Sequence, residues 1–179
     1  MKRLVPGLVA VLLAAACGGT AQAPTPTATT AAPTTAAPTA TPAPTPAAVV
    51  LKADLKSSEE NPPIAGPEAS CSGTGEVTFN PDRSVKFDVE IKGCPDSAVI
   101  NIGHIHEGAK GTNGAVRVNT GLVAGELKLT AGGVKFTKNV ASVDAAVFSA
   151  ILANPAGYYL NFHSAANATG VIRGQLEKK

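Results

Sequence analysis

Strict alternation of apolar and charged residues between positions 85 and 91 limits the choice of fold more than any other feature of the chain. Successive side chains of a β-strand point to opposite faces, so a period of two predicts a strand with one buried face and one exposed face. The apolar members of this stretch are Val85, Phe87, Val89 and Ile91, and the residues between them are all charged. A helix would scatter these four side chains around its surface.

Shorter alternations recur along the chain, and turn motifs separate them. The turns include Asn80-Pro81-Asp82 and Gly132-Gly133, whose residue types favour reversals of direction. About eight or nine short strands at this spacing predict an all-β fold, an antiparallel, Greek-key-like β-sandwich. The other strands are expected at 51–55, 77–79, 98–106, 116–118, 127–129, 134–136, 158–162 and 170–176.

One segment follows a different period and predicts a single short helix. Between Ser142 and Ala153 the apolar residues recur at the spacing that places them on one helical face. Ser142 is the expected N-cap, Asp144 lies in the first turn, and Asn154-Pro155 ends the helix.

The first 16 residues have the pattern of an export signal. Lys2 and Arg3 form a basic start, and an apolar run follows from Leu4 to Ala16. A helix of that length extends for about 20 Å, which is too short to span a bilayer core of about 30 Å. We therefore expect residues 1–16 to be a signal peptide and the protein to be exported.

Cys17 follows three alanines and precedes two glycines, an arrangement that resembles the lipobox of bacterial lipoproteins. The resemblance implies that Cys17 becomes the lipidated first residue and anchors the protein to the outer face of a bacterial membrane, at the cell surface or on the periplasmic side. One position departs from the pattern, because Ala14 stands where lipoboxes usually carry leucine. The alternative is a secreted protein with an ordinary cleaved signal.

Residues 17–48 are predicted to be a disordered linker between this cysteine and a folded domain at 49–179. Apart from Gln22, every residue from 20 to 48 is Thr, Ala or Pro. Such a segment has no large apolar side chain whose burial would offset the entropy of ordering it. Proline-rich chain is extended, so the linker is expected to act as a spacer.

The charge balance excludes nucleic acid as a partner. Lys2 and Arg3 account for the whole net charge of +2, which leaves the rest of the chain neutral. With no Trp and only two Tyr, the chain lacks the basic, stacking surface that nucleic-acid binding requires.

The two remaining cysteines, Cys71 and Cys94, are expected to form a disulfide. They flank two predicted strands that a hairpin at Pro81-Asp82 would place side by side. Thiols in an exported domain meet an oxidising compartment, which favours pairing. The alternative is a pair of buried free thiols.

All three histidines lie at predicted strand ends. His104 and His106 are two residues apart, so their side chains leave the same face of one strand, and His163 closes another. Three neutral imidazoles suit copper or zinc, and Asn161, on the same face as His163, is a candidate to orient it. The alternative is structural, with the histidines donating to carbonyls of the glycine-rich segment 107–114.

The predicted folded domain resembles the CHRD (chordin-type) domain, because it contains four motifs of that family in the same order along the chain. They are His104-Ile105-His106-Glu107-Gly108, the Gly-x-x-Gly loop at Gly111–Gly114, the strand Tyr158–His163, and Gly170–Leu176. The resemblance covers about residues 51–176 and implies a β-sandwich. It implies little about activity, because no general biochemical role is assigned to bacterial members of this family. The segment 164–169 departs from the family pattern, and the two cysteines look like a local addition.

A fainter similarity links the histidine pattern to the copper half of copper–zinc superoxide dismutase. His104, His106 and His163 match in spacing, but no histidine remains for a bridging ligand or a zinc cluster. Dismutase chemistry is therefore not expected.

Two functions remain open. The favoured one is a non-enzymatic, lipid-anchored surface module that binds or adheres to a protein or cell-envelope ligand, since the sequence carries no catalytic motif. The other is a mononuclear copper or zinc protein using His104, His106 and His163. Arg173, in an otherwise apolar strand, is expected to pair with a carboxylate or loop carbonyls, with a binding role as the alternative.

Overall fold

The computed structural model describes residues 46–179. The predicted signal peptide, Cys17 and nearly all of the linker lie outside the described residues. Within residues 46–179 no helix has both the length and the apolar character needed to cross a membrane.

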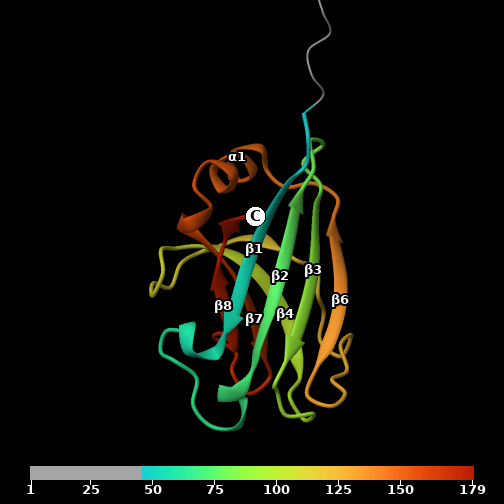
Figure 1. The fold of residues 1–179 in the computed structure, drawn as a ribbon, viewed down its shortest axis with the longest axis vertical. Helices are drawn as coiled ribbons and strands as arrows, with labels where there is room; N and C mark the ends of the chain where they lie inside the picture. The colour runs from blue at the N-terminus through green and yellow to red at the C-terminus, as the bar shows by residue number, and fades with distance from the viewer. Residues whose placement is uncertain (1–45) are drawn as a thin grey trace, which may run out of the picture. The chain divides into compact units, whose positions relative to one another are not determined.

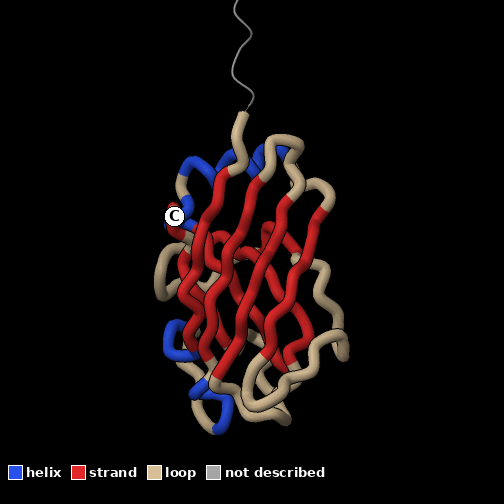
Figure 2. Tube along the Cα trace, turned by 45° about the vertical axis from the view of Figure 1, so that its right-hand side comes forward, coloured by secondary structure: helices blue, strands red, loops and turns tan. Residues whose placement is uncertain are grey.

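Nine strands form one antiparallel sheet in the order β5-β4-β7-β8-β1-β2-β3-β6, with β9 paired to β1. The sheet curls into a nearly closed barrel of two layers, with β1, β2, β3 and β6 in front of β4, β7 and β8 in Figure 1. Figure 2 shows the same strands after a turn of 45° about the vertical axis. The predicted all-β class is confirmed. The strands are β1 (Val49–Lys56), β2 (Ser72–Phe79), β3 (Val85–Lys92), β4 (Ile100–Glu107), β5 (Val116–Asn119), β6 (Val134–Val140), β7 (Tyr158–Ser164), β8 (Ile172–Gln175) and β9 (Glu177–Lys178).

The core lies between the two layers, and alternation along the strands fills it. In β3, Phe87 is fully buried, whereas the neighbouring Lys86 is exposed. Phe136 of β6 meets Phe162 of β7 edge to face, with ring centroids 5.7 Å apart, so the far edge of the front layer packs against the back layer. The alternation in the sequence therefore correctly predicted which side chains of the strand point into the core.

Two expectations were wrong in detail. The single helix, α1 (Ala145–Ala153), is capped by Asp144 and not by Ser142, because the Asp144 carboxylate accepts hydrogen bonds from the backbone N–H groups of Ala146 and Val147. Residues 127–129 form no strand. Leu129 lies in a loop that turns at Gly125 and Gly132, both of which have positive φ, and its side chain is buried in the core. The apolar residues at 127 and 129 therefore reflect burial of a loop and not a strand.

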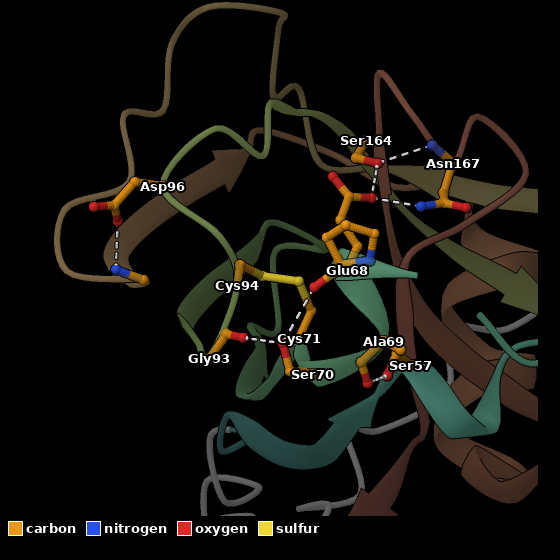
Figure 3. The surroundings of a disulfide bond; sticks show 12 residues. Ser57, Glu68, Ala69, Ser70, Cys71, Gly93, Cys94, Asp96, Ser164 and Asn167 are labelled. Carbon is orange, nitrogen blue, oxygen red and sulfur yellow. Dashed lines mark hydrogen bonds between the residues drawn. A yellow bond between two sulfur atoms is a disulfide. The ribbon is translucent and has the colours of Figure 1, made fainter. Parts of the chain in front are cut away.

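Cys71 and Cys94 form a disulfide at the open end of the β2–β3 hairpin (Figure 3). Cys71 directly precedes β2, and Cys94 lies just beyond β3. The two residues are 23 positions apart, and closing a loop of that size stabilises the fold by about 3 kcal/mol in the chain-entropy model. The short 3-10 helix η2 (Pro67–Ser70) ends at this bond.

Strand β7 is buried on both faces, which is the feature that positions the candidate site. Its inner face carries Leu160 and Phe162 into the core, and its outer face carries Tyr159, Asn161 and His163. Three loops cover the outer face: residues 57–71, which include η1 (Ser57–Glu59) and η2, residues 108–115, and residues 165–171. Side-chain amides join the first two loops, since Asn61 donates to the Gly111 carbonyl and Asn113 donates to the Asn61 carbonyl, both at 2.8 Å. The remaining short helix, η3 (Pro155–Gly157), leads into β7.

Candidate metal centre

The structure brings together the three histidines that the sequence singled out. One ring nitrogen from each of His104, His106 and His163 lies within 4.8 Å of the others. Ring centroids are 5.1 Å apart for His104 and His163, 5.4 Å for His104 and His106, and 5.9 Å for His106 and His163. The three rings are therefore close enough for one ion to be bound by all of them after small side-chain shifts.

Strand pairing produces the convergence. β4 and β7 are adjacent and antiparallel, with His104 opposite Asn161 and His106 opposite Tyr159. Residues opposite each other in a sheet share a face, so both histidines of β4 lie on the same outer face as His163. The two strands are neighbours in the sheet although 50 residues of chain separate them, including β5, β6 and α1.

His106 is oriented by a backbone carbonyl. Its Nδ1 donates to the Gly114 carbonyl at 2.9 Å, which assigns the proton to Nδ1 and a lone pair to Nε2. That Nε2 is buried and has no hydrogen-bond partner among the described residues. The ring of Tyr159 stacks on the imidazole at 5.0 Å and limits its rotation.

His163 is oriented in the same way. Its Nδ1 donates to the Ala168 carbonyl at 3.0 Å, so its Nε2 also carries a lone pair. The Nδ1 of His104 lies 3.2 Å from that Nε2 and is the donor when each ring carries one proton. The free lone pairs of His106 and His163 are therefore on Nε2, and His104 can bind an ion through Nδ1 once its proton has moved to its own Nε2.

Gly114 allows the loop to reach His106. A Cβ at this position would overlap the Glu107 carbonyl, so only glycine permits the close approach of the two backbone segments. The Gly114 N–H donates to the Tyr159 hydroxyl at 3.1 Å while its carbonyl accepts from His106. The N–H and the carbonyl of Gly114 thus hold the side chains of Tyr159 and His106 respectively.

All three imidazoles are kept in the neutral form that binds metal. Burial, reinforced by the neighbouring imidazoles of His163 and His106, lowers the pKa of His104 to about 4. Burial also lowers the pKa of His106 and of His163, against the opposing effect of the carbonyls to which they donate. A neutral histidine need not lose a proton before it binds an ion.

The donor set fits copper or zinc. Two nitrogens bound to one ion at 2.0–2.1 Å lie at most about 4.2 Å apart, so binding requires side-chain shifts of under about 1 Å. Imidazole nitrogens are common ligands of both metals. His104 is only partly buried, whereas His106 and His163 are buried.

The structure places Arg173 beside the histidines as a buried clamp. Its guanidinium donates to the Glu59 carbonyl at 2.5 Å, the Thr112 carbonyl at 3.1 Å and the Asn113 side chain at 2.9 Å. It lies 4.8 Å from the centre of the Tyr159 ring, on which His106 also stacks. Arg173 thus joins two of the covering loops to the sheet.

Asn161 and Glu60 complete the buried polar layer. Asn161 lies between His104 and Arg173 in register, yet within residues 46–179 it makes no hydrogen bond to a histidine, so backbone carbonyls take the orienting role that the sequence suggested for it. A Glu60 carboxylate oxygen lies 3.7 Å from the Nε atom of Arg173. Burial raises the pKa of Glu60 to about 7, and the charge of Arg173 opposes that rise.

The sequence did not indicate several residues on which the site depends. The carbonyls of Gly114 and Ala168 are main-chain groups that every residue has, so the sequence does not indicate which of them accept hydrogen bonds from the histidines. Glu60 and Glu68 lie in polar, proline-containing segments, where acidic side chains are usually solvated, and both are buried here. Only Gly114 had a signal, as the last residue of a Gly-x-x-Gly loop.

Comparison with known proteins matches a family model and two chains among the solved structures. The family model described as CHRD domain matches residues 51–176. No curated protein matches the chain. Among solved structures, a mutant of superoxide dismutase 5 from Candida albicans is similar, with a TM-score of 0.43 and 18% identity over 74% of this chain and 93% of that one.

Proposed function

The chain belongs to the CHRD domain family, and from this premise and the histidine geometry we propose that it is an exported metal-binding protein. One copper or zinc ion is bound by Nδ1 of His104 and the Nε2 atoms of His106 and His163. The Gly114 and Ala168 carbonyls hold two of these rings in the tautomer that presents Nε2 to the ion.

The buried Nε2 of His106 carries this proposal. A purely structural histidine would be satisfied by its bond to Gly114, but here the second nitrogen is enclosed without a partner among the described residues. Leaving a buried polar atom unsatisfied costs about 1–3 kcal/mol. An ion shared with His104 and His163 removes that cost.

This observation favours the second of the two functions that the sequence left open. Presentation of a surface for binding or adhesion does not require three imidazoles to converge under a cover of loops. Between the two metals, copper(II) is expected to bind more tightly, because the affinity of a nitrogen site for divalent ions is highest for copper. Three protein ligands leave a coordination position open on the His104 side for water or a small ligand.

Metal titration of protein purified without an affinity tag tests the proposal. We expect one equivalent of copper(II) or zinc to bind, and His106→Ala to weaken binding by at least about 100-fold because one of three ligands is lost. The matched control is Asp88→Asn, which removes a partly exposed carboxylate of β3, in the other layer of the fold, and should leave the affinity unchanged. Equal affinities for the wild type and His106→Ala would refute the metal site.

We also propose that a lipid on Cys17 anchors the protein to the outer face of a bacterial membrane, with residues 17–48 as the spacer. The disulfide supports an oxidising compartment outside the cytoplasm. In cell fractionation the wild type is expected with the membranes and Cys17→Ser in the soluble fraction, since stable anchoring needs more than one acyl chain and serine carries none. Wild-type protein found wholly in the soluble fraction would exclude the anchor.

A further inference from the structure

The loop that follows His163 sets the orientation of this ligand. Residues 165–170 turn back immediately after β7, and the Ala168 carbonyl within this loop accepts the hydrogen bond from His163. A movement of the loop therefore moves the acceptor that keeps the Nε2 atom of His163 directed at the other two histidines.

Glu68 holds this loop from the opposite side. Its side chain is buried, with 6% of the residue exposed. A single carboxylate oxygen, Oε2, accepts hydrogen bonds from the Ser164 hydroxyl at 2.6 Å and from the Asn167 side-chain amide at 2.5 Å (Figure 3). The Ser164 hydroxyl in turn accepts from the Asn167 N–H at 2.9 Å. The loop is thus tied at its beginning and at the residue before Ala168.

The disulfide holds Glu68 in place. Glu68 lies in η2, and its carbonyl accepts from the N–H of Cys71, the residue bonded to Cys94. Ser70, between them, donates to the Gly93 carbonyl at 2.6 Å. In Figure 3 the Glu68 carboxylate lies between the Cys71–Cys94 bond and the side chains of Ser164 and Asn167.

We propose that Glu68 is a positioning residue for the metal centre, and that the Cys71–Cys94 disulfide acts on metal affinity through it. The chain of contacts runs from the disulfide through η2 and Glu68 to the loop, and from the Ala168 carbonyl to His163. This inference rests on the metal-binding function proposed above.

Two substitutions of Glu68 separate positioning from the loss of a charge. Both donors reach the same oxygen, so Glu68→Gln can keep both hydrogen bonds with its amide oxygen, whereas Glu68→Ala loses them. We expect copper(II) affinity to fall about 10–100-fold in Glu68→Ala and less than about threefold in Glu68→Gln. The Cys71→Ala/Cys94→Ala double variant is expected to lose affinity in the same direction, and it contributes no thiol that could bind copper itself.

Nitrogen NMR of the metal-free protein provides a second readout that does not depend on metal binding. In the wild type and Glu68→Gln, His163 is expected to be protonated on Nδ1 alone. In Glu68→Ala a mixture of the two tautomers is expected, because the Ala168 carbonyl is displaced. Failure of the wild type to bind metal would overturn the proposed function. Wild-type binding together with unchanged affinity and an unchanged tautomer in Glu68→Ala would overturn the positioning role alone.

Discussion

Replacement of Arg173 by alanine is expected to lower the free energy of unfolding by about 3–5 kcal/mol. The variant leaves the buried Glu60 carboxyl without its neighbouring cation. It also removes the donor from the carbonyls of Glu59 and Thr112, which the guanidinium joins. Removing one member of a buried charged pair is costly because the other remains buried and uncompensated. Urea unfolding measures the difference.

The pH dependence of this variant identifies Glu60 as the cause. Arg173 lowers the pKa of Glu60, so its removal should raise that pKa beyond the present value of about 7. A carboxyl whose pKa is raised by folding gives stability at low pH that is lost as the pH rises through the folded-state value. The deficit of Arg173→Ala is therefore expected to be larger at pH 8 than at pH 5.

A surface arginine provides the control. Arg117 pairs with Glu107 while roughly half of each side chain remains exposed. Exposed ion pairs contribute little, so Arg117→Ala should change the free energy of unfolding by less than about 1 kcal/mol. Equal effects of the two alanine variants would show that Arg173 does not act as a buried clamp.

Replacement of Gly114 by alanine is expected to cost about 3 kcal/mol of unfolding free energy and at least about tenfold in metal affinity. The added Cβ would overlap the Glu107 carbonyl, so the two backbone segments must separate. That separation displaces the Gly114 carbonyl from His106 and its N–H group from Tyr159. Thermal unfolding and copper(II) titration of the same variant measure both effects.

Gly111→Ala is the matched control in the same loop. A Cβ at Gly111 meets no atom within 4 Å, and the cost arises only from its positive φ of 78°. That conformation costs about 1–2 kcal/mol for alanine and does not move the carbonyl that holds His106. If Gly111→Ala weakened metal binding as much as Gly114→Ala, the close approach at Gly114 would not be what orients His106.

The strands could be predicted because burial on one face imposes a period that the residue types record. Val85 to Ile91 shows the period most clearly, and the structure makes this segment the β3 strand. Where a loop buries an apolar residue, as at Leu129, the same residue types mislead, because burial itself does not require a strand.

The candidate site could be predicted only in part. The shared face of His104 and His106 follows from their spacing alone. Their meeting with His163 depends on β4 lying beside β7, a pairing between segments far apart in the sequence. The burial of Glu60 and Glu68 depends on how loops fold over a sheet, which local patterns do not record.

Because both faces of β7 are buried, a wrong register of this strand is destabilising on each face separately. A slip of one residue exchanges the two faces of a strand. In a strand with one solvent-exposed face, such a slip moves apolar side chains into water and polar side chains into the core. In β7 it would force Asn161 and His163 into the core and press Leu160 and Phe162 against the polar loops, since neither face opens to water. A misregistered β7 would also carry His163 away from His104 and His106, so under the proposed function metal uptake would report that this strand has found its correct register.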